Sequence, residues 1–399
     1  MTKTLRLRWL LLGALIVNTA SSFIWPLTTV YMHNYLHESL TVSGWVLFFY
    51  SITMVVGNYL GGYLFDRWSR YKTMIVGVGL MVINAGLLIF YHGWPNYALF
   101  LILLGLGNGI VATGINSYAT VVHGYRSSYI FNVLYFMNNL GLVLGTLLVG
   151  IVLPMGIADV FIVAFVLFVA FILVVIFGYH VPEPKFNQVY QLKHAHHHPA
   201  KSTLLRMIIL MLALLITWVA YEQWQSNISS YMLSLHMSIQ KYSFVWTFNA
   251  ILIVLFQPLL TAFDRWLLQH LMGRMYVGFV IMSSSFIILL VAKHYTMFLA
   301  SMALLTIGEI AVFPAVSTFV DRLASLHEKG KYQGYVNMFA SIGRAIGPLV
   351  GAQIVDFTAS YRILFLCCVL AMFAITTLFI IINIYLDKKI GSVVCADNK

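Results

Sequence analysis

Three charged residues stand inside long, mostly apolar stretches of the sequence, where charge is costly. They are Glu222, Glu309 and Arg344. A charged side chain at membrane depth costs upwards of about 2.5 kcal/mol, so it must face a cavity or a partner. A carboxyl group in a cavity of low dielectric constant can bind a proton near neutral pH and release it on hydration. The two glutamates are therefore candidate proton and cation sites.

Glu309 is the first candidate of the pair and Glu222 the second. At about 1.5 Å per residue, Glu309 falls near the middle of its stretch. The alternative for each glutamate is a structural ion pair with Arg344, which could instead hold an anionic substrate group. Amides in the same stretches could line a cavity or bond neighbouring helices, and the sequence leaves both roles open. These amides are Asn18, Asn108, Asn116, Asn138, Gln223 and Asn227.

The stretches that carry these residues are long enough to cross a membrane. Of the 399 residues, 61% are apolar and 9% are charged, and the mean hydropathy is +0.89. This composition excludes a soluble globular domain and a disordered chain. A bilayer core requires about 20 apolar residues per helix. On that scale the sequence predicts twelve spans, near 9–31, 43–64, 73–91, 97–121, 129–153, 158–180, 204–232, 243–262, 276–292, 296–320, 334–356 and 363–386.

The basic residues predict how the chain lies in the membrane. With both termini inside the cell, most of the 23 Lys and Arg fall on the cytoplasmic side, as the positive-inside rule requires. The net charge of +11 sits in short clusters between apolar runs, whereas nucleic-acid binding needs a continuous basic face. We therefore expect a multi-pass protein of the cell membrane, with both termini cytoplasmic and no nucleic-acid partner.

A polar segment at 181–202 divides the spans into two sets of six. It predicts a cytoplasmic linker between an N-terminal bundle, 1–180, and a C-terminal bundle with a short tail, 203–399. The run from His194 to His198 could bind a transition metal. No acidic or cysteine residue stands nearby, so a solvated loop with chance clustering of histidines is the favoured interpretation, and no metal site is predicted.

The two sets of spans carry an internal repeat. The tetrapeptide at 65–68 recurs at 263–266, and 263 − 65 = 198. Gly141 and Gly145 correspond to Gly343 and Gly347, and 343 − 141 = 202. A repeat in the same orientation indicates two pseudo-symmetric bundles, as in many transporters. These glycines fit close helix packing or a bend equally well, and Pro348 favours a bend in span 334–356.

The segment Gly62–Lys72 carries a glycine four residues before Asp66, followed by Arg67 and Arg70. It resembles the loop-two signature of the major facilitator superfamily, with Ser69 where the family usually has glycine. The segment 343–351, with its glycines and Pro348, looks like the glycine-proline signature of drug:proton antiporters. The segment 306–314, which contains Glu309 and ends in a proline, is similar to span ten of bacterial multidrug efflux members.

This resemblance implies a gate on the cytoplasmic side. An acid at the end of span two can face the positive N-terminal end of a neighbouring helix, and in the family this cluster latches the two halves when the outside is open. The alternative is that the charges only orient the loop. In the second copy Leu260 replaces the expected glycine. The implied gate residues are Gly62, Asp66, Arg67, Arg70, Asp264 and Arg265.

The expected function is secondary transport by alternating access. The spans contain carboxyl groups but few arginines, which favours proton-coupled efflux of amphipathic or cationic compounds, a multidrug antiporter. The alternative is proton-coupled transport of a sugar, peptide or glycolipid. The segment 105–109 lacks the membrane arginine that many proton-coupled relatives carry. No nucleophile–base group or nucleotide loop is present, so we expect no enzyme and no cofactor. The resemblance implies a monomer in a bacterial inner membrane, with small molecules and protons as partners.

Overall fold

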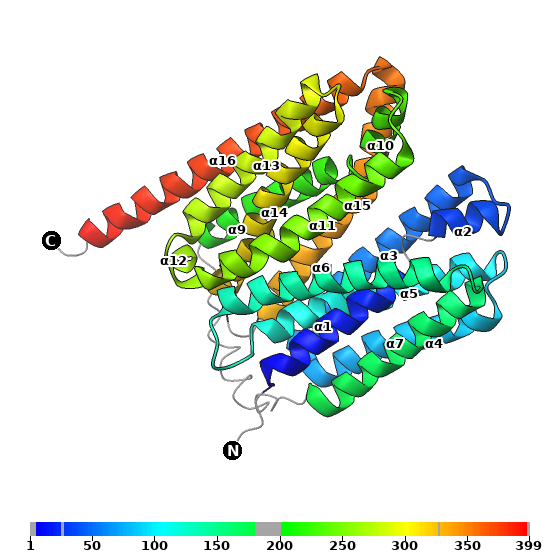
Figure 1. The fold of residues 1–399 in the computed structure, drawn as a ribbon. Helices are drawn as coiled ribbons and strands as arrows, with labels where there is room; N and C mark the ends of the chain where they lie inside the picture. Colours follow the sequence, from blue (N-terminus) through cyan, green and yellow to red (C-terminus); the bar gives the residue numbers. More distant parts are fainter. Residues whose placement is uncertain (1–4, 25–27, 180–200, 326–327, 397–399) are drawn as a thin grey trace. The chain divides into compact units, whose positions relative to one another are not determined.

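The fold is known from a computed structural model that describes residues 5–24, 28–179, 201–325 and 328–396. In these ranges every regular element is an α-helix. Eleven helices are long and apolar enough to cross a membrane, and α1 (Leu7–Ser22) is a shorter apolar helix. The prediction of an all-α membrane protein with twelve transmembrane helices is confirmed (Figure 1). Most of the predicted linker 181–202, with His194–His198, lies outside the described residues.

The first half of the chain forms one bundle, with the fully buried side chains Phe161, Phe168 and Phe171 at its core. Helix α1 packs against α6 and α7, while α5 packs against both α3 and α4 (Figure 1). Besides α1, its helices are α2 (Thr28–Asn34), α3 (Leu40–Arg67), α4 (Arg70–Phe90), α5 (Asn96–Ala119), α6 (Ser127–Val152) and α7 (Ile157–Gly178).

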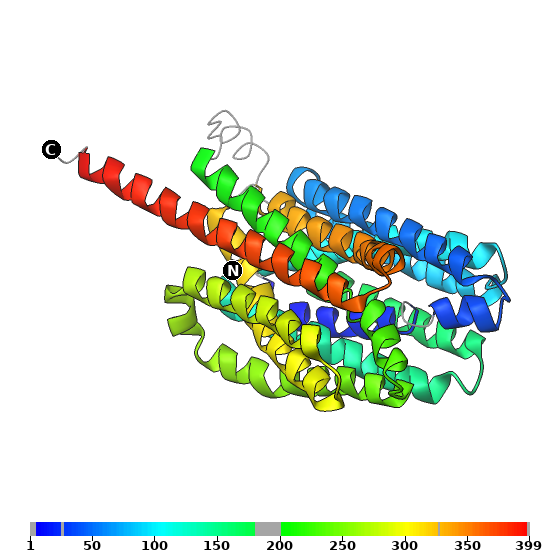
Figure 2. The same cartoon turned by 90° about the horizontal axis from the view of Figure 1, so that it is seen from above.

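The second half of the chain begins with α9 (Lys201–Tyr221) and ends with α16 (Tyr361–Ala396). Helix α16 packs against α9 and against α13, and Figure 2 shows α9 and α16 side by side. Between them lie α10 (Asn227–Ser234), α11 (Ile239–Ala262), α12 (Asp264–Gln269), α13 (Leu271–Val291), α14 (Tyr295–Leu323) and α15 (Lys329–Thr358).

Contacts between residues in space divide the chain into two compact units that do not coincide with the two halves of the sequence. Unit 1 consists of Met1–Pro184, Ile253–Asp264 and Ser317–Ala345. Unit 2 consists of Lys185–Leu252, Arg265–Val316 and Ile346–Lys399. The first bundle is therefore packed with one end each of α11, α14 and α15. The boundary between sequence domains at 181–202 stays a prediction.

The first span of each half is interrupted. The sequence predicts one continuous helix over 204–232, but α9 ends at Tyr221 and turns connect it to α10. The side chain of Gln223 donates to the backbone oxygens of Val219, at 2.7 Å, and of Gly347, at 2.8 Å. Polar side chains that bond the backbone in this way compete with the helix. Helix α1 ends at Ser22, and 221 − 22 = 199, so both breaks follow the repeat.

Candidate functional site

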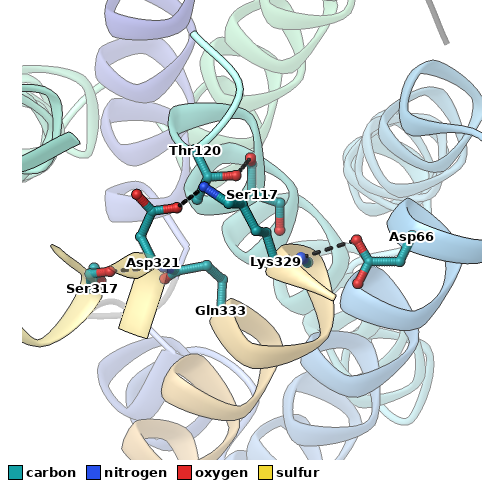
Figure 3. Close-up of polar contacts among 8 residues, drawn as sticks. Asp66, Ser117, Thr120, Ser317, Asp321, Lys329 and Gln333 are labelled. Atoms are coloured by element: carbon teal, nitrogen blue, oxygen red, sulfur yellow. Dashed lines mark hydrogen bonds and ion pairs between the residues drawn. The ribbon is translucent and has the colours of Figure 1, made fainter. Parts of the chain in front are cut away.

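Asp66, on the last turn of α3, caps the start of α15. Its Oδ1 accepts a hydrogen bond from the backbone N–H of Gly330 at 3.0 Å, and its Oδ2 accepts one from Lys331 at 2.7 Å. The first N–H groups of a helix lack partners within that helix and carry partial positive charge. Figure 3 shows the carboxylate directed at this helix end. We call the contact of Asp66 with Gly330 and Lys331 the latch.

Glycine is required on both sides of the latch because the two helices approach so closely. A Cβ atom at Gly62 would lie 2.5 Å from the backbone oxygen of Gly330. A Cβ atom at Gly330 would lie 2.7 Å from Oδ1 of Asp66. Any larger residue at either position would push α15 away from α3. The signature glycine at 62 therefore has a direct steric reason.

The remaining signature residues shape the loop that follows Asp66. Ser69 is the N-cap of α4 and its side chain accepts a hydrogen bond from the N–H of Lys72 at 3.3 Å, which explains serine at a position where the resemblance predicts glycine. The guanidinium of Arg67 lies 5.7 Å from the ring centre of Tyr63. That of Arg70 lies 5.5 Å from the ring centre of Phe65. Both arginines thus stack on aromatic residues of α3.

An ion pair beside the latch was missed by the sequence analysis. Nζ of Lys329 lies 2.7 Å from Oδ1 of Asp321, and these side chains are 16% and 8% exposed. Gln333 donates to the backbone oxygen of Ser317 at 2.9 Å. Together these contacts fasten the start of α15 to the end of α14 (Figure 3). Both charges adjoin apolar runs, so the sequence treats them as ordinary loop charges.

The second copy of the signature makes a different contact. Asp264 is buried at the start of α12, and its Oδ2 lies 3.4 Å from Nε of Arg126, whose side chain is 45% exposed. The amide of Asn132 donates to Oδ1 of Asp264 at 3.4 Å. Asp264 therefore faces side chains where Asp66 faces helix amides, and its contacts are longer. Arg265 is exposed at the same helix start.

One face of α15 continues from the latch along the first bundle. It presents small or polar residues at alternating spacings of four and three, namely Gly330, Gly334, Asn337, Ser341 and Arg344. Asn116 donates to the side-chain oxygen of Asn337 at 3.2 Å, and Asn58 donates to the hydroxyl of Ser341 at 2.9 Å. Arg344 donates to the same hydroxyl at 3.2 Å. We call this row, with Asn58 and Asn116, the polar seam of unit 1.

The other predicted cavity amides also bond neighbouring groups. Asn18 donates to Asn138 between α1 and α6 at 2.9 Å, and Asn108 donates to the hydroxyl of Tyr50 at 2.8 Å. In unit 2, Asn227 donates to Gln223 at 2.7 Å. These bonds connect helices or stabilise the turn after α9. A cavity role for them stays a prediction.

The predicted bend and packing glycines lie in tight helix contacts. Cβ atoms at Gly141 and Gly145 would lie 2.7 Å and 2.5 Å from atoms of α1. A Cβ atom at Gly347 would lie 2.9 Å from Cβ of Glu222. Gly343 and Pro348 lie within α15, which continues to Thr358. The packing role is therefore visible at three of these positions, and a bend stays a prediction.

Glu309 is the centre of a buried polar group in unit 2. Its side chain is on α14, the residue is 3% exposed, and its Oε2 accepts hydrogen bonds from the hydroxyl of Tyr221 and the amide of Asn249, each at 3.3 Å. The amide of Asn249 also donates to the hydroxyl of Thr306 at 2.8 Å. Glu222 is buried directly after Tyr221, at the end of α9. The sequence analysis did not identify Tyr221 or Asn249.

Aromatic rings pack around Tyr221, the hydroxyl donor to this carboxyl group. The rings of Trp218 and Phe313 are stacked, with centres 4.9 Å apart and planes 4° from parallel. Tyr221 lies 5.1 Å from Trp218 and 6.2 Å from Trp246, between ring centres. Trp218, Trp246 and Phe313 are only partly buried. Aromatic faces attract cations. Aromatic residues make up 15% of the sequence, and no local pattern singles out these rings.

A repeat of six-helix sets in an all-helical membrane fold, with a buried carboxyl group among aromatic rings, defines a membrane transporter and not an enzyme. The chain belongs to the Major Facilitator Superfamily, whose family model matches residues 10–348. It is thus a multi-pass secondary transporter, in a family that moves small molecules across membranes.

Relatives and solved structures agree with this membership. The chain is 37% identical to the MFS-type transporter YttB of Bacillus subtilis (strain 168), over 97% of this chain and 96% of the relative. Multidrug resistance protein 1 of the same organism is 32% identical over 94 residues, 23% of this chain and 24% of that protein. The crystal structure of the human organic anion transporter MFSD10 is similar in fold, with a TM-score of 0.76 and 14% identity, over 94% and 98% of the two chains.

Proposed function

We propose that this transporter exports amphipathic cations in exchange for protons. The observation that carries the proposal is the buried carboxyl group of Glu309, which accepts hydrogen bonds from Tyr221 and Asn249 beside the stacked rings of Trp218 and Phe313. A carboxyl group in this setting can hold either a proton or an organic cation. The aromatic faces stabilise a delocalised or alkylated cation next to it.

In the proposed cycle, a proton and a substrate cation compete for Glu309. The protonated acid has no charge to offer, so the cation leaves when the proton binds. Glu222 is one position after Tyr221, whose hydroxyl bonds Glu309, and it is the second proposed proton site. Arg344 belongs to the polar seam and is proposed as a counter-charge for an acid or for an anionic substrate group.

The latch is proposed to close the cytoplasmic side. This assignment uses the predicted orientation, with both termini in the cytoplasm and the positively charged loops beside them. The two short hydrogen bonds from α15 to Asp66 must then break before substrate enters from the cytoplasm. Arg67, Arg70, Asp264 and Arg265 belong to the same gate in this proposal.

The relatives support the multidrug assignment to a limited extent. The partial match to Multidrug resistance protein 1 spans 23% of this chain, and the extended match is to an MFS-type transporter of a bacterium. A location in a bacterial inner membrane, as a monomer, is part of the proposal. A sugar, peptide or glycolipid is the alternative substrate, and the experiment below separates it from a cation.

Everted membrane vesicles containing the wild-type protein or Glu309→Gln test the proposal. Ethidium uptake into vesicles with an acidic interior is expected for the wild type, together with proton release that a pH-sensitive dye records. Glu309→Gln should stop both signals while the protein stays in the membrane. Glu38→Gln is the matched control, because Glu38 lies between α2 and α3 and belongs to unit 1, whereas the Glu309 group belongs to unit 2.

Two results would overturn the proposal. Undiminished ethidium transport by Glu309→Gln removes the assignment of the proton and cation site. Proton movement that follows added sugars, peptides or glycolipids, with no response to cationic dyes, establishes the alternative substrate class instead.

A further inference from the structure

A buried arginine on α13 binds the backbone of α14 directly after Glu309. Arg274 is 6% exposed and lies on the first turn of α13. Arg274 lies just before the predicted span 276–292, so the sequence predicts a loop residue at this position. The structure corrects this assignment and places Arg274 within a helix that is apolar enough to cross a membrane. An arginine in such a position is a functional candidate by default.

The guanidinium binds two consecutive backbone oxygens. Its Nε donates to the oxygen of Ala311 at 2.8 Å, and its Nη2 donates to the oxygen of Ile310 at 3.1 Å. Both residues follow Glu309 on α14. The planar guanidinium carries several N–H groups in fixed directions, so two bonds to neighbouring carbonyls fix the local backbone in position and in rotation.

Pro314 explains why the backbone oxygen of Ile310 needs an external donor. It lies inside α14, and proline has no N–H group to donate to the carbonyl four residues earlier. The carbonyl of Ile310 therefore lacks its usual helical partner. In the membrane interior no bulk water is available to replace it, and neighbouring helices must supply the donor. Arg274 supplies that donor.

Close packing of α13 on α14 holds the arginine in reach. A Cβ atom at Gly278, one turn after Arg274, would lie 2.6 Å from a side-chain carbon of Val312. A Cβ atom at Gly308 would lie 2.3 Å from Cγ of Met282. These two glycines allow direct contact of the two helices in the turns of α13 that follow Arg274. The α13–α14 pair therefore presents Glu309 from a rigid support.

We propose that Arg274 is the positioning residue of the Glu309 site. By completing the hydrogen bonding of α14 at Pro314, it sets the direction from which the Glu309 carboxyl group meets Tyr221 of α9 and Asn249 of α11. Glu222, which follows Tyr221 directly after α9, is also a buried acid of unit 2. The inference rests on the proposed function, since it assigns Arg274 a role through Glu309.

A double-mutant cycle with Pro314 tests the inference. Arg274→Met removes the donor, whereas Pro314→Ala restores an N–H group for the carbonyl of Ile310. In everted vesicles, Arg274→Met should raise the KM for ethidium about 5- to 100-fold, because a buried carbonyl is left without a partner. In the Pro314→Ala background the same substitution should raise KM by less than about threefold. Lys293→Met, between α13 and α14, is the matched loss of an exposed cation.

Arg274→Lys keeps the charge and one donor, and should raise KM less than Arg274→Met does. Where Arg274→Met fails to accumulate in the membrane, Arg274→Lys and Arg274→Gln are compared in the two backgrounds instead. Equal losses with Pro314 and with Ala at that position, or an unchanged KM in all Arg274 variants, would overturn the inference. If Glu309→Gln transports ethidium normally, the proposed function fails. If Glu309→Gln is inactive but the Arg274 variants keep the wild-type KM, only the inference about Arg274 fails.

Discussion

Asp66 and Asp264 occupy equivalent positions in the two copies of the repeat and meet different partners. Asp66 accepts two short hydrogen bonds from backbone N–H groups at a helix start. Asp264 meets a half-exposed arginine at 3.4 Å. Hydrogen bonds to a charged group contribute about 1.5–3 kcal/mol. Those of Asp66 connect α3 to α15, whereas the buried Asp264 contacts Arg126 and Asn132. The two acids should therefore differ in what they contribute to the gate.

The same substitution at both acids measures this difference. Asp66→Asn can accept only one of the two N–H groups and loses the charge, so the latch should weaken by about 1.5–3 kcal/mol. Hydrogen exchange of the first turn of α15 should then accelerate about 10- to 100-fold. Asp264→Asn should change that exchange by less than about fivefold, because its contacts are with Arg126 and Asn132 and not with α15. Equal effects of the two substitutions would contradict this account of the latch.

Replacement of Trp218 is expected to weaken the binding of cationic substrates and not that of neutral ones. Its ring stacks on Phe313 and lies 5.1 Å from Tyr221, between ring centres. Trp218→Leu keeps an apolar side chain and removes the aromatic face, so the KM for a cationic dye should rise about 2- to 30-fold. Trp266→Leu, at an exposed position on α12, is the matched control. A proportional loss for neutral compounds would instead indicate general packing damage.

Helix α15 is the main element of the proposed gate, because its first turn holds the latch and its next three turns hold the polar seam. Gly62→Leu would place a side chain where only 2.5 Å separates a Cβ atom from the Gly330 oxygen. The latch should then fail to form, with transport reduced about tenfold or more. Gly79→Leu is the matched control, since a Cβ atom there meets nothing within 4 Å. Vesicle transport rates and exchange of the α15 first turn report both effects.

The sequence predicts the elements of this fold better than their contacts. Composition and span length give twelve helices, because the bilayer imposes a nearly fixed length on each. The break after Tyr221 was missed because Gln223 meets Gly347, a residue distant in sequence. Arg274 falls just outside the predicted span 276–292, and its partners are backbone oxygens of another helix, which no local pattern encodes. Glu309 could be recognised from the sequence because a charged residue inside an apolar stretch is energetically costly. Tyr221 and Asn249 could be identified only from the packed structure.

At the scale of the whole molecule, the two contact units share α11, α14 and α15. Within α14 the division falls between Glu309, in unit 2, and Asp321, in unit 1. Each neutral hydrogen bond of the polar seam contributes about 0.5–1.5 kcal/mol to the stability of the closed seam. A proton or cation that binds one conformation more tightly than the other can supply a free-energy difference of this size. The proposed cycle requires that the seam open and close as the occupant of Glu309 changes.

A reversible cross-link across the seam tests this requirement. Asn58→Cys with Ser341→Cys replaces two hydrogen-bonded side chains, 2.9 Å apart, from α3 and α15, in a background where Cys367, Cys368 and Cys395 are Ser. Oxidation should stop transport, and reduction should restore it, because alternating access needs the seam to open once per cycle. Dye binding to Glu309 should persist in the oxidised protein, since no residue of that group is changed.

The matched cross-link joins two helices within the second half. The hydroxyl of Ser301 on α14 donates to the backbone oxygen of Ser285 on α13 at 2.8 Å. Gly278 and Gly308 allow these same two helices to pack closely. Ser285→Cys with Ser301→Cys should leave the transport rate independent of oxidation, because a rigid pair has no need to separate. Transport that survives oxidation of the Asn58–Ser341 cross-link would show that α15 does not leave α3 during the cycle. The gate would then have to lie elsewhere in the chain.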